Sequence, residues 1–149
     1  MERDFIKNIK VEGSQLKKSN AEERRLATEA LVADNYFCVP NSNATEYDLI
    51  ISQTGEKILF NIIGHGEINL QIKLPSRKFK RLIKDYFLIF DNHNNALESN
   101  FSPEKIETID MGRRAIHNEA AELLLSELEG KVITDFKTAR KLFTVLTSL

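Results

Sequence analysis

The sequence predicts an α+β fold in which strands and helices occupy different parts of the chain. Three consecutive segments between Tyr47 and Leu74 alternate apolar and polar residues with the period of two that is typical of strands. In the C-terminal half, apolar residues recur at intervals of three and four, as they do in amphipathic helices. Because the strands cluster in the sequence and do not alternate with helices, an α+β architecture is favoured over an α/β one.

Length and composition predict a single domain that covers residues 1–149. A chain of this length with 42% hydrophobic residues can bury one core but is short for two. The 21 basic and 22 acidic side chains nearly cancel, so the molecule as a whole lacks the charge of a nucleic-acid binder. No apolar run is long enough to span a membrane, the N-terminal residues do not resemble a signal peptide, and Cys38 is the only cysteine. We therefore expect a cytoplasmic protein that neither enters a membrane nor contains a disulfide.

The N-terminal part of the chain is predicted to contain a short strand and one helix. Residues 4–12 alternate apolar and polar residues imperfectly, and a Gly-Ser pair follows them. Asn20 can cap a helix whose first turn carries acids and whose narrow apolar stripe extends to about Asn35. The charged residues of this helix indicate a solvated surface.

A three-stranded antiparallel meander is predicted for the middle of the chain. Residues 53–56 and 64–67 are rich in glycine and polar residues and are suited to the turns between adjacent strands. One face of such a sheet is buried and the other is polar. The apolar positions of the three strands are Tyr47, Leu49 and Ile51; Ile58, Phe60 and Ile62; and Ile68, Leu70, Ile72 and Leu74.

Three helices are predicted to follow and to pack on one face of the sheet. The first opens after Pro75, and the polar residues 91–99 are expected to break it. The second begins at residues 102–104, where a serine can act as the N-cap and a proline suits the first helical position, and it ends near Gly130. The third starts at residue 134 or 135, a threonine or an aspartate that can cap it, and extends to the C-terminus.

A polar cluster interrupts the apolar face of the second of these helices. Arg113 lies in line between Ile109 and Ile116 at the helical period of about 100° per residue. Because an unpaired guanidinium is costly to bury, we expect Arg113 to be mostly buried and paired with Asp110 or Asp85. The cluster can be a structural network between packed helices or the lining of a ligand pocket. Its members are Asp85, Asp110, Arg113, Arg114, His117, Asn118 and Glu119.

Two residues of this helix carry more specific expectations. His117 is expected to be neutral at pH 7, because burial and the nearby arginines both disfavour its charged form. It would then link helices by donating a hydrogen bond from one ring nitrogen and accepting one at the other. Gly112 lies in the helix interior, where glycine costs about 1 kcal/mol relative to alanine, so we expect another backbone to come close to it.

A basic segment lies at the junction of the last strand and the first C-terminal helix. It places six basic residues within twelve positions, and we expect them to form one exposed patch: Lys73, Arg77, Lys78, Lys80, Arg81 and Lys84. Cations in the first turns of a helix oppose its dipole, so this patch would favour an anion. A solvated surface, an acidic partner and a phosphate backbone are all compatible with it. Nucleic-acid binding is not expected, because no exposed aromatic residues are interleaved to stack on bases.

Three segments of the chain match the pattern of a known family. They are residues 84–89 (Lys-Asp-Tyr-Phe-Leu-Ile), residues 106–119 (Ile-Glu-Thr-Ile-Asp-Met-Gly-Arg-Arg-Ala-Ile-His-Asn-Glu) and residues 135–144 (Asp-Phe-Lys-Thr-Ala-Arg-Lys-Leu-Phe-Thr). The chain resembles uncharacterised protein family 0262, a family of small alphaproteobacterial proteins, over most of its length. The resemblance implies no activity. The sequence departs from the family pattern at residues 91–95, where aromatic and acidic residues are expected, and at residues 120–121, where glycine and serine are expected.

The sequence lacks the motifs that mark common enzyme chemistries. It has no Gly-x-Ser-x-Gly elbow and no glycine-rich phosphate loop. A metal site would require His93, His117 and acids from two helices to converge, and neither a metal nor a cofactor is predicted. We expect a non-enzymatic binding or regulatory module that uses the basic segment for an acidic protein partner, with homodimer formation as an additional option. The alternative is a small-molecule-binding protein or enzyme with a polar site around Asp85, Asp110, Arg113 and His117.

Overall fold

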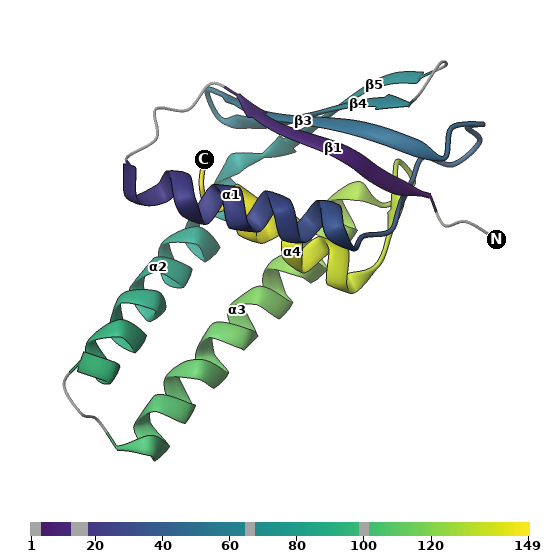
Figure 1. Cartoon of the computed structure of the whole chain (residues 1–149). Coiled ribbons are helices and arrows are strands. Elements are labelled where there is room, and N and C mark those ends of the chain that lie inside the picture. The colour runs from purple at the N-terminus through teal and green to yellow at the C-terminus, as the bar shows by residue number, and fades with distance from the viewer. Residues whose placement is uncertain (1–3, 13–17, 65–67, 99–101) are drawn as a thin grey trace.

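A four-stranded mixed sheet with helices on one face forms the body of the protein (Figure 1). The computed structural model describes residues 4–12, 18–64, 68–98 and 102–149. The predicted α+β class is confirmed. Along the chain, the strands and helices of the described residues are β1 (Phe5–Glu12), α1 (Lys18–Ala33), β2 (Phe37–Cys38), β3 (Glu46–Thr54), β4 (Lys57–Gly64), β5 (Ile68–Pro75), α2 (Ser76–Glu98), α3 (Pro103–Leu128), β6 (Ile133–Thr134) and α4 (Phe136–Leu146).

The main sheet has the strand order β1-β3-β4-β5. The predicted meander is confirmed, because β3, β4 and β5 pair antiparallel in sequence order and bury the predicted apolar side chains of β3 and β4. The edge strand β1 pairs with β3 in parallel. Parallel pairing requires a crossover connection, and α1 supplies it. A second, two-stranded sheet joins β2 to β6.

The imperfect alternation of β1 has a structural cause. The register between β1 and β3 shifts between Ile6 and Asn8, so Lys7 is an extra residue in the strand. Such a bulge moves the following residues to the opposite face. Ile6 is fully buried before the bulge, and Ile9 and Val11 turn toward the core after it.

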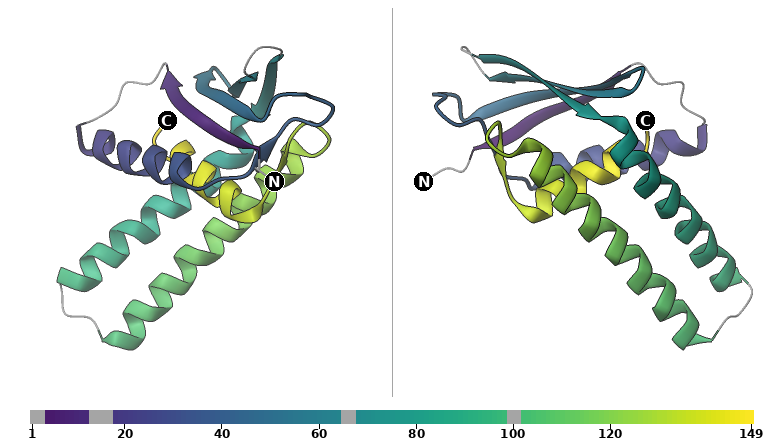
Figure 2. Two further views of the ribbon diagram at one scale, coloured as in Figure 1. Left: turned by 45° about the vertical axis from the view of Figure 1, so that its right-hand side comes forward. Right: turned by 180° about the vertical axis from the view of Figure 1, so that it is seen from behind.

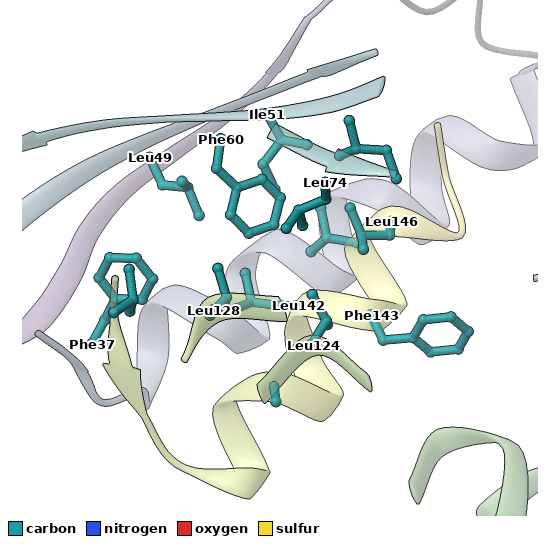
Figure 3. Close-up of a cluster of buried hydrophobic side chains, with 14 of the residues drawn as sticks. Phe37, Leu49, Ile51, Phe60, Leu74, Leu124, Leu128, Leu142, Phe143 and Leu146 are labelled. Carbon is teal, nitrogen blue, oxygen red and sulfur yellow. The ribbon is translucent and has the colours of Figure 1, made fainter. Parts of the chain in front are cut away.

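The hydrophobic core lies between the sheet and the helices beneath it (Figure 3). The inner face of the sheet contributes side chains such as Phe60 and Leu74, which meet Leu142 and Leu146 of α4. The C-terminal part of α3 adds Leu128 from below. The buried face of β4 and the apolar face of α4 therefore pack against each other in one layer.

The helices α2 and α3 form an antiparallel pair that extends away from the sheet (Figure 2). Only the ends nearest the sheet enter the core, with Phe79 and Leu82 from α2 and the residues of α3 from Ile116 onward. The rest of the pair, residues 87–98 and 103–115, is called the arm below. No residue of the arm with a described side chain is fully buried.

Most predicted helix boundaries agree with the structure, but two do not. The side chain of Asp135 accepts a hydrogen bond from the Thr138 backbone N–H at 2.8 Å, so aspartate caps α4. The expectation that residues 91–99 break α2 is wrong, because the helix continues to Glu98. Asparagine is only mildly unfavourable in a helix, and residues 91–98 contain neither glycine nor proline. Helix α1 begins at Lys18, two residues before the predicted cap.

Candidate functional site

The six residues of the basic segment are all exposed, and they are called the basic surface below. Lys78 donates to Glu127 at 2.6 Å, and Arg81 donates to Glu119 at 2.7 Å, so two of the six are neutralised by acids on α3. The remaining four have no ion pair with any described residue: Lys73, Arg77, Lys80 and Lys84. Positive charge is therefore concentrated on the outer side of α2 and on the adjacent end of β5.

His117 lies where α2, α3 and α4 meet. Its ring packs edge-on against Tyr86 of α2, with ring centroids 5.2 Å apart, and against Phe143 of α4 at 5.7 Å. Burial, followed by the positive charges of Arg140 and Arg113, lowers the pKa of His117 from 6.5 to about 4. The imidazole is therefore neutral at pH 7.

A surface depression of about 350 Å³ opens beside His117, between α3 and α4. Its lining is mostly basic, and it is called the cationic depression: His117, Lys137, Arg140, Lys141 and Thr144. The ammonium group of Lys141 already has one hydrogen-bond partner within the protein, because its Nζ donates to the Asp34 carbonyl oxygen at 2.6 Å. Lys137 and Arg140 have no ion pair with a described residue.

A second depression of about 360 Å³ lies between α1, α2 and the end of α4. It is called the apolar depression, and its lining is Glu23, Leu26, Ala27, Ala30, Tyr86, Thr144, Thr147 and Ser148. Thr144 lines both depressions, and Tyr86 of this one packs against His117 of the other. The two depressions are therefore neighbours.

The polar cluster predicted around Arg113 is not assembled as expected. Arg113 is only half-buried, and no ion pair joins it to Asp85 or Asp110, all three of which are described residues. The prediction is wrong because Arg113 stands on the arm, where no side chain that the structure describes is fully buried. Partial solvation replaces the carboxylate that a buried guanidinium would need.

The other members of the cluster lie in different surroundings. Asp110 and Arg114 line a depression on α3 itself, together with Ile106 and Met111. The remaining members do not join them: Asp85 is half-buried on α2, Asn118 is exposed, and Glu119 is exposed and ion-paired with Arg81. The structure thus brings His117 close to the cations of α4, and no acid of the cluster lines the cationic depression.

The expectation that another backbone approaches Gly112 is also wrong. Among the described residues, a side chain added there would meet only Cδ1 of Ile89, at 3.4 Å, which is the end of a flexible side chain. The glycine therefore has no packing role that the described residues reveal.

Potential metal ligands do not cluster among the side chains that the structure describes: no three His, Cys, Asp or Glu gather closely enough there to hold a metal ion. The side chain of His93, which the sequence leaves as a candidate ligand, lies outside the described side chains. Burial raises the pKa of the Cys38 thiol to about 11, so it stays protonated.

No helix in the described ranges is both long and apolar enough to cross a bilayer.

Sequence reasoning missed the part of the site that α4 contributes. Lys137, Arg140 and Lys141 stand three and four positions apart, which places them on one face of a helix. That spacing was visible in the sequence as a basic stripe. Its proximity to His117 was not, because it depends on how α3 and α4 pack.

Comparisons with known proteins agree on one family. The model of the uncharacterised protein family UPF0262 matches residues 3–149. A UPF0262 protein of Caulobacter vibrioides is 39% identical over 147 residues, covering 97% of this chain and 91% of the relative. A UPF0262 protein of Phenylobacterium zucineum is 40% identical over 128 residues, which cover 86% of this chain and 79% of the relative. A UPF0262 protein of Erythrobacter litoralis is 38% identical over 157 residues, which cover 100% of this chain and 98% of the relative. No solved structure matches the chain. The chain therefore belongs to the uncharacterised protein family UPF0262, as its sequence motifs predict.

Proposed function

We propose that the protein is a cytoplasmic, non-enzymatic binding or regulatory module, built as a single domain, that contacts an acidic protein partner through the basic surface. One observation carries this proposal. Lys73, Arg77, Lys80 and Lys84 are exposed and have no ion pair with a described residue, although the whole chain has a net charge of only −1. Local concentration of unpaired charge in a nearly neutral molecule favours a role in recognition.

The position of the basic surface on α2 supports an anionic partner. The first turn of α2 contains no acid, and three of the unpaired cations lie in its first nine residues. Each cation near a helix N-terminus destabilises the helix by about 0.3–1 kcal/mol, because its charge opposes the helix dipole. Carboxylates of a partner would offset this repulsion and gain charge-assisted hydrogen bonds.

A protein partner fits the surface better than a nucleic acid does. The aromatic residue within the basic segment, Phe79, is fully buried, and Tyr86 and Phe87 beyond it are half-buried. Among the described side chains of α2, bases would therefore find no exposed aromatic ring on which to stack. Backbone phosphates alone would bind weakly and with a strong dependence on salt.

The proposal can be tested by affinity purification from the native bacterium with nuclease treatment. The bait variant is Arg77→Gln/Lys80→Gln/Lys84→Gln. The matched control is Lys7→Gln/Lys10→Gln/Lys131→Gln, which removes three exposed cations from β1 and from the connection between α3 and β6, away from the basic surface. We expect a protein that co-purifies with the wild type and the control, is lost from the bait variant, and dissociates as salt is raised. Identical partners for all three baits, or a partner that nuclease removes, would contradict the proposal.

Self-association through the arm is a second candidate, favoured by two exposed apolar side chains. Leu88 is 55% exposed and Met111 is 62% exposed. Near the arm tip, Glu104 and Glu107 of α3 are exposed and have no ion pair with a described residue. In an antiparallel pairing of two arms, the basic surface of one copy faces these acids of the other, so the charges are complementary in a two-fold dimer.

A further inference from the structure

The cationic and apolar depressions share Thr144 and are joined by the contact between Tyr86 and His117. Each is within the range of about 300–1,000 Å³ that is typical of small-molecule pockets, although both are open to solvent. An elongated ligand could therefore occupy both. The chemistry of the two linings differs, which indicates what kind of ligand would fit.

The cationic depression can hold an anion. Lys137 and Arg140 line it, lie near the N-terminal end of α4 and have no ion pair with a described residue. Arg140 lines this depression together with His117, and Arg113 stands four residues before His117 in α3, so both guanidinium charges disfavour a charged imidazole. No aspartate or glutamate is among the described lining residues. An anionic group would thus meet several positive charges together.

The apolar depression offers a surface for an apolar chain. Leu26 is 53% exposed there, and Ala30 is also exposed, so both present carbon to a ligand. Burying such surface stabilises a complex by roughly 25 cal/mol per Å².

Three hydroxyl groups in the lining of the apolar depression are occupied within the protein. The hydroxyls of the three lining residues Thr144, Thr147 and Ser148 donate to the backbone carbonyls of Arg140, Thr144 and Val145. Glu23 also lines this depression, and its charge would repel an anion there. Arg24 also adjoins this depression, because it donates to the hydroxyl and the carbonyl oxygen of Ser148. One acid and one cation thus stand at this end, whereas the described lining of the cationic depression contains cations and no acid, so a negatively charged group matches the His117 end better.

We propose that the two depressions form one binding site for a small amphiphilic anion, such as a medium-chain carboxylate or alkyl phosphate. The acidic group lies beside Lys137 and Arg140, and the apolar chain lies along Leu26 and Ala30. This site is separate from the basic surface of α2, so it adds a ligand to the proposed partner-binding module and does not depend on it.

The test titrates the full chain with decanoate and decyl phosphate below their micelle concentrations, measured by calorimetry and by amide NMR shifts. Decanol, decyltrimethylammonium and acetate separate the contributions of charge and chain. Arg140→Gln removes charge at the anionic end, and Ala30→Trp fills the apolar end at an exposed position. The matched controls are Lys80→Gln on the basic surface and Ala21→Trp, nine residues away on the opposite side of α1. Circular dichroism establishes that each variant is folded.

We expect an anionic probe to bind the wild type and both controls, with affinity at least tenfold lower for Arg140→Gln and for Ala30→Trp. Decanol, decyltrimethylammonium and acetate should each bind more weakly than the matching anion. The tighter of the two anions identifies the acidic group as a carboxylate or a phosphate. Equal affinity in all variants, equal affinity for decanol and decanoate, or no binding of either anion would overturn the proposal.

Discussion

The imidazole of His117 meets the ring of Tyr86 edge-on, with the two ring planes at 88°. Phe143 contacts both rings, so one aromatic side chain from each of α2, α3 and α4 meets at the point where the arm leaves the body. His117 contacts α2 and α4 by ring packing and not by the predicted hydrogen bonds. The predicted hydrogen bonds are absent, since within the described residues neither ring nitrogen has a partner.

His117→Phe is expected to reduce the loss of stability on acidification. The folded protein holds the pKa of His117 at about 4, against 6.5 ordinarily. Between these values the unfolded chain binds a proton that the folded chain does not. The contribution of the neutral His117 to the free energy of unfolding is therefore fully present above pH 6.5, decreases as the pH falls and is lost near pH 4. With allowance for solvent screening of a partly exposed ring, the effect is about 1–2 kcal/mol.

Urea denaturation at pH 7 and pH 4 measures this difference. Phenylalanine keeps the edge-on contacts with Tyr86 and Phe143 but cannot bind a proton. Asn118→Ala, at the exposed neighbouring position, serves as the control and should keep the pH dependence of the wild type. The same loss of stability in His117→Phe and the wild type would show that His117 does not contribute.

Gly112→Ala is expected to stabilise the protein by up to about 1 kcal/mol, because alanine is the better helix former in the middle of α3. Among the described residues, the added methyl group meets only the end of the flexible Ile89 side chain, which can move by a few tenths of an ångström. Ala115→Gly, at an exposed position of the same helix, should destabilise by a similar amount. Thermal unfolding of both variants provides the measurement, and a lower melting temperature for Gly112→Ala would indicate a close contact there.

Gly64→Ala is expected to destabilise the protein by about 1–3 kcal/mol. The new Cβ would lie 2.7 Å from Cβ of Ala44, and neither atom can turn away by a change of rotamer. Adding Ala44→Gly should recover part of the loss, and a double-mutant cycle in urea measures this coupling. Additive effects of the two substitutions would exclude the clash as the cause.

Asn35→Ala is expected to lower the free energy of unfolding by about 2–3 kcal/mol, because the Asn35 side chain is the hydrogen-bond partner of three backbone groups. The Asn35 amide accepts from the Ile6 N–H at 2.7 Å and donates to the carbonyl oxygens of Ile6 and Leu31 at 3.0 and 2.8 Å. These bonds fasten the edge strand β1 to the end of α1. Urea denaturation measures the loss. Asn61→Ala, which removes an exposed bond to Gln71, is the control and should change stability by less than about 0.5 kcal/mol.

Leu88→Ser/Met111→Ser is expected to abolish self-association, if the arm pairs with a second copy. Sedimentation velocity over a range of concentrations should show a dimer for the wild type and a monomer for the variant. Ile133→Ser, which removes an apolar side chain that is 49% exposed on β6, is the control and should leave the dimer intact. A wild type that stays monomeric at high protein concentration would remove the arm from consideration as an interface.

The sequence by itself determined the parts of this protein that depend on local periodicity and capping. The alternation of residues 47–74 requires a meander with one buried face, since side chains of a strand point to opposite sides. Asp135 and Ser102 mark helix starts because their side chains satisfy free backbone N–H groups. The exposure of the basic segment was also predictable, because charged side chains at helical spacing avoid the core.

Only the tertiary structure decided which faces of the helices are covered. The apolar stripe of α3 suggested burial along its whole length, and Arg113 was predicted to be buried with it. In the structure, α2 and α3 leave the body before this level, so Arg113 is half-solvated, and Leu88 and Met111 are exposed. The parallel pairing of β1 with β3 and the meeting of His117 with the cations of α4 were likewise decided by packing. Such contacts join residues far apart in the chain, and periodicity within one segment carries no information about them.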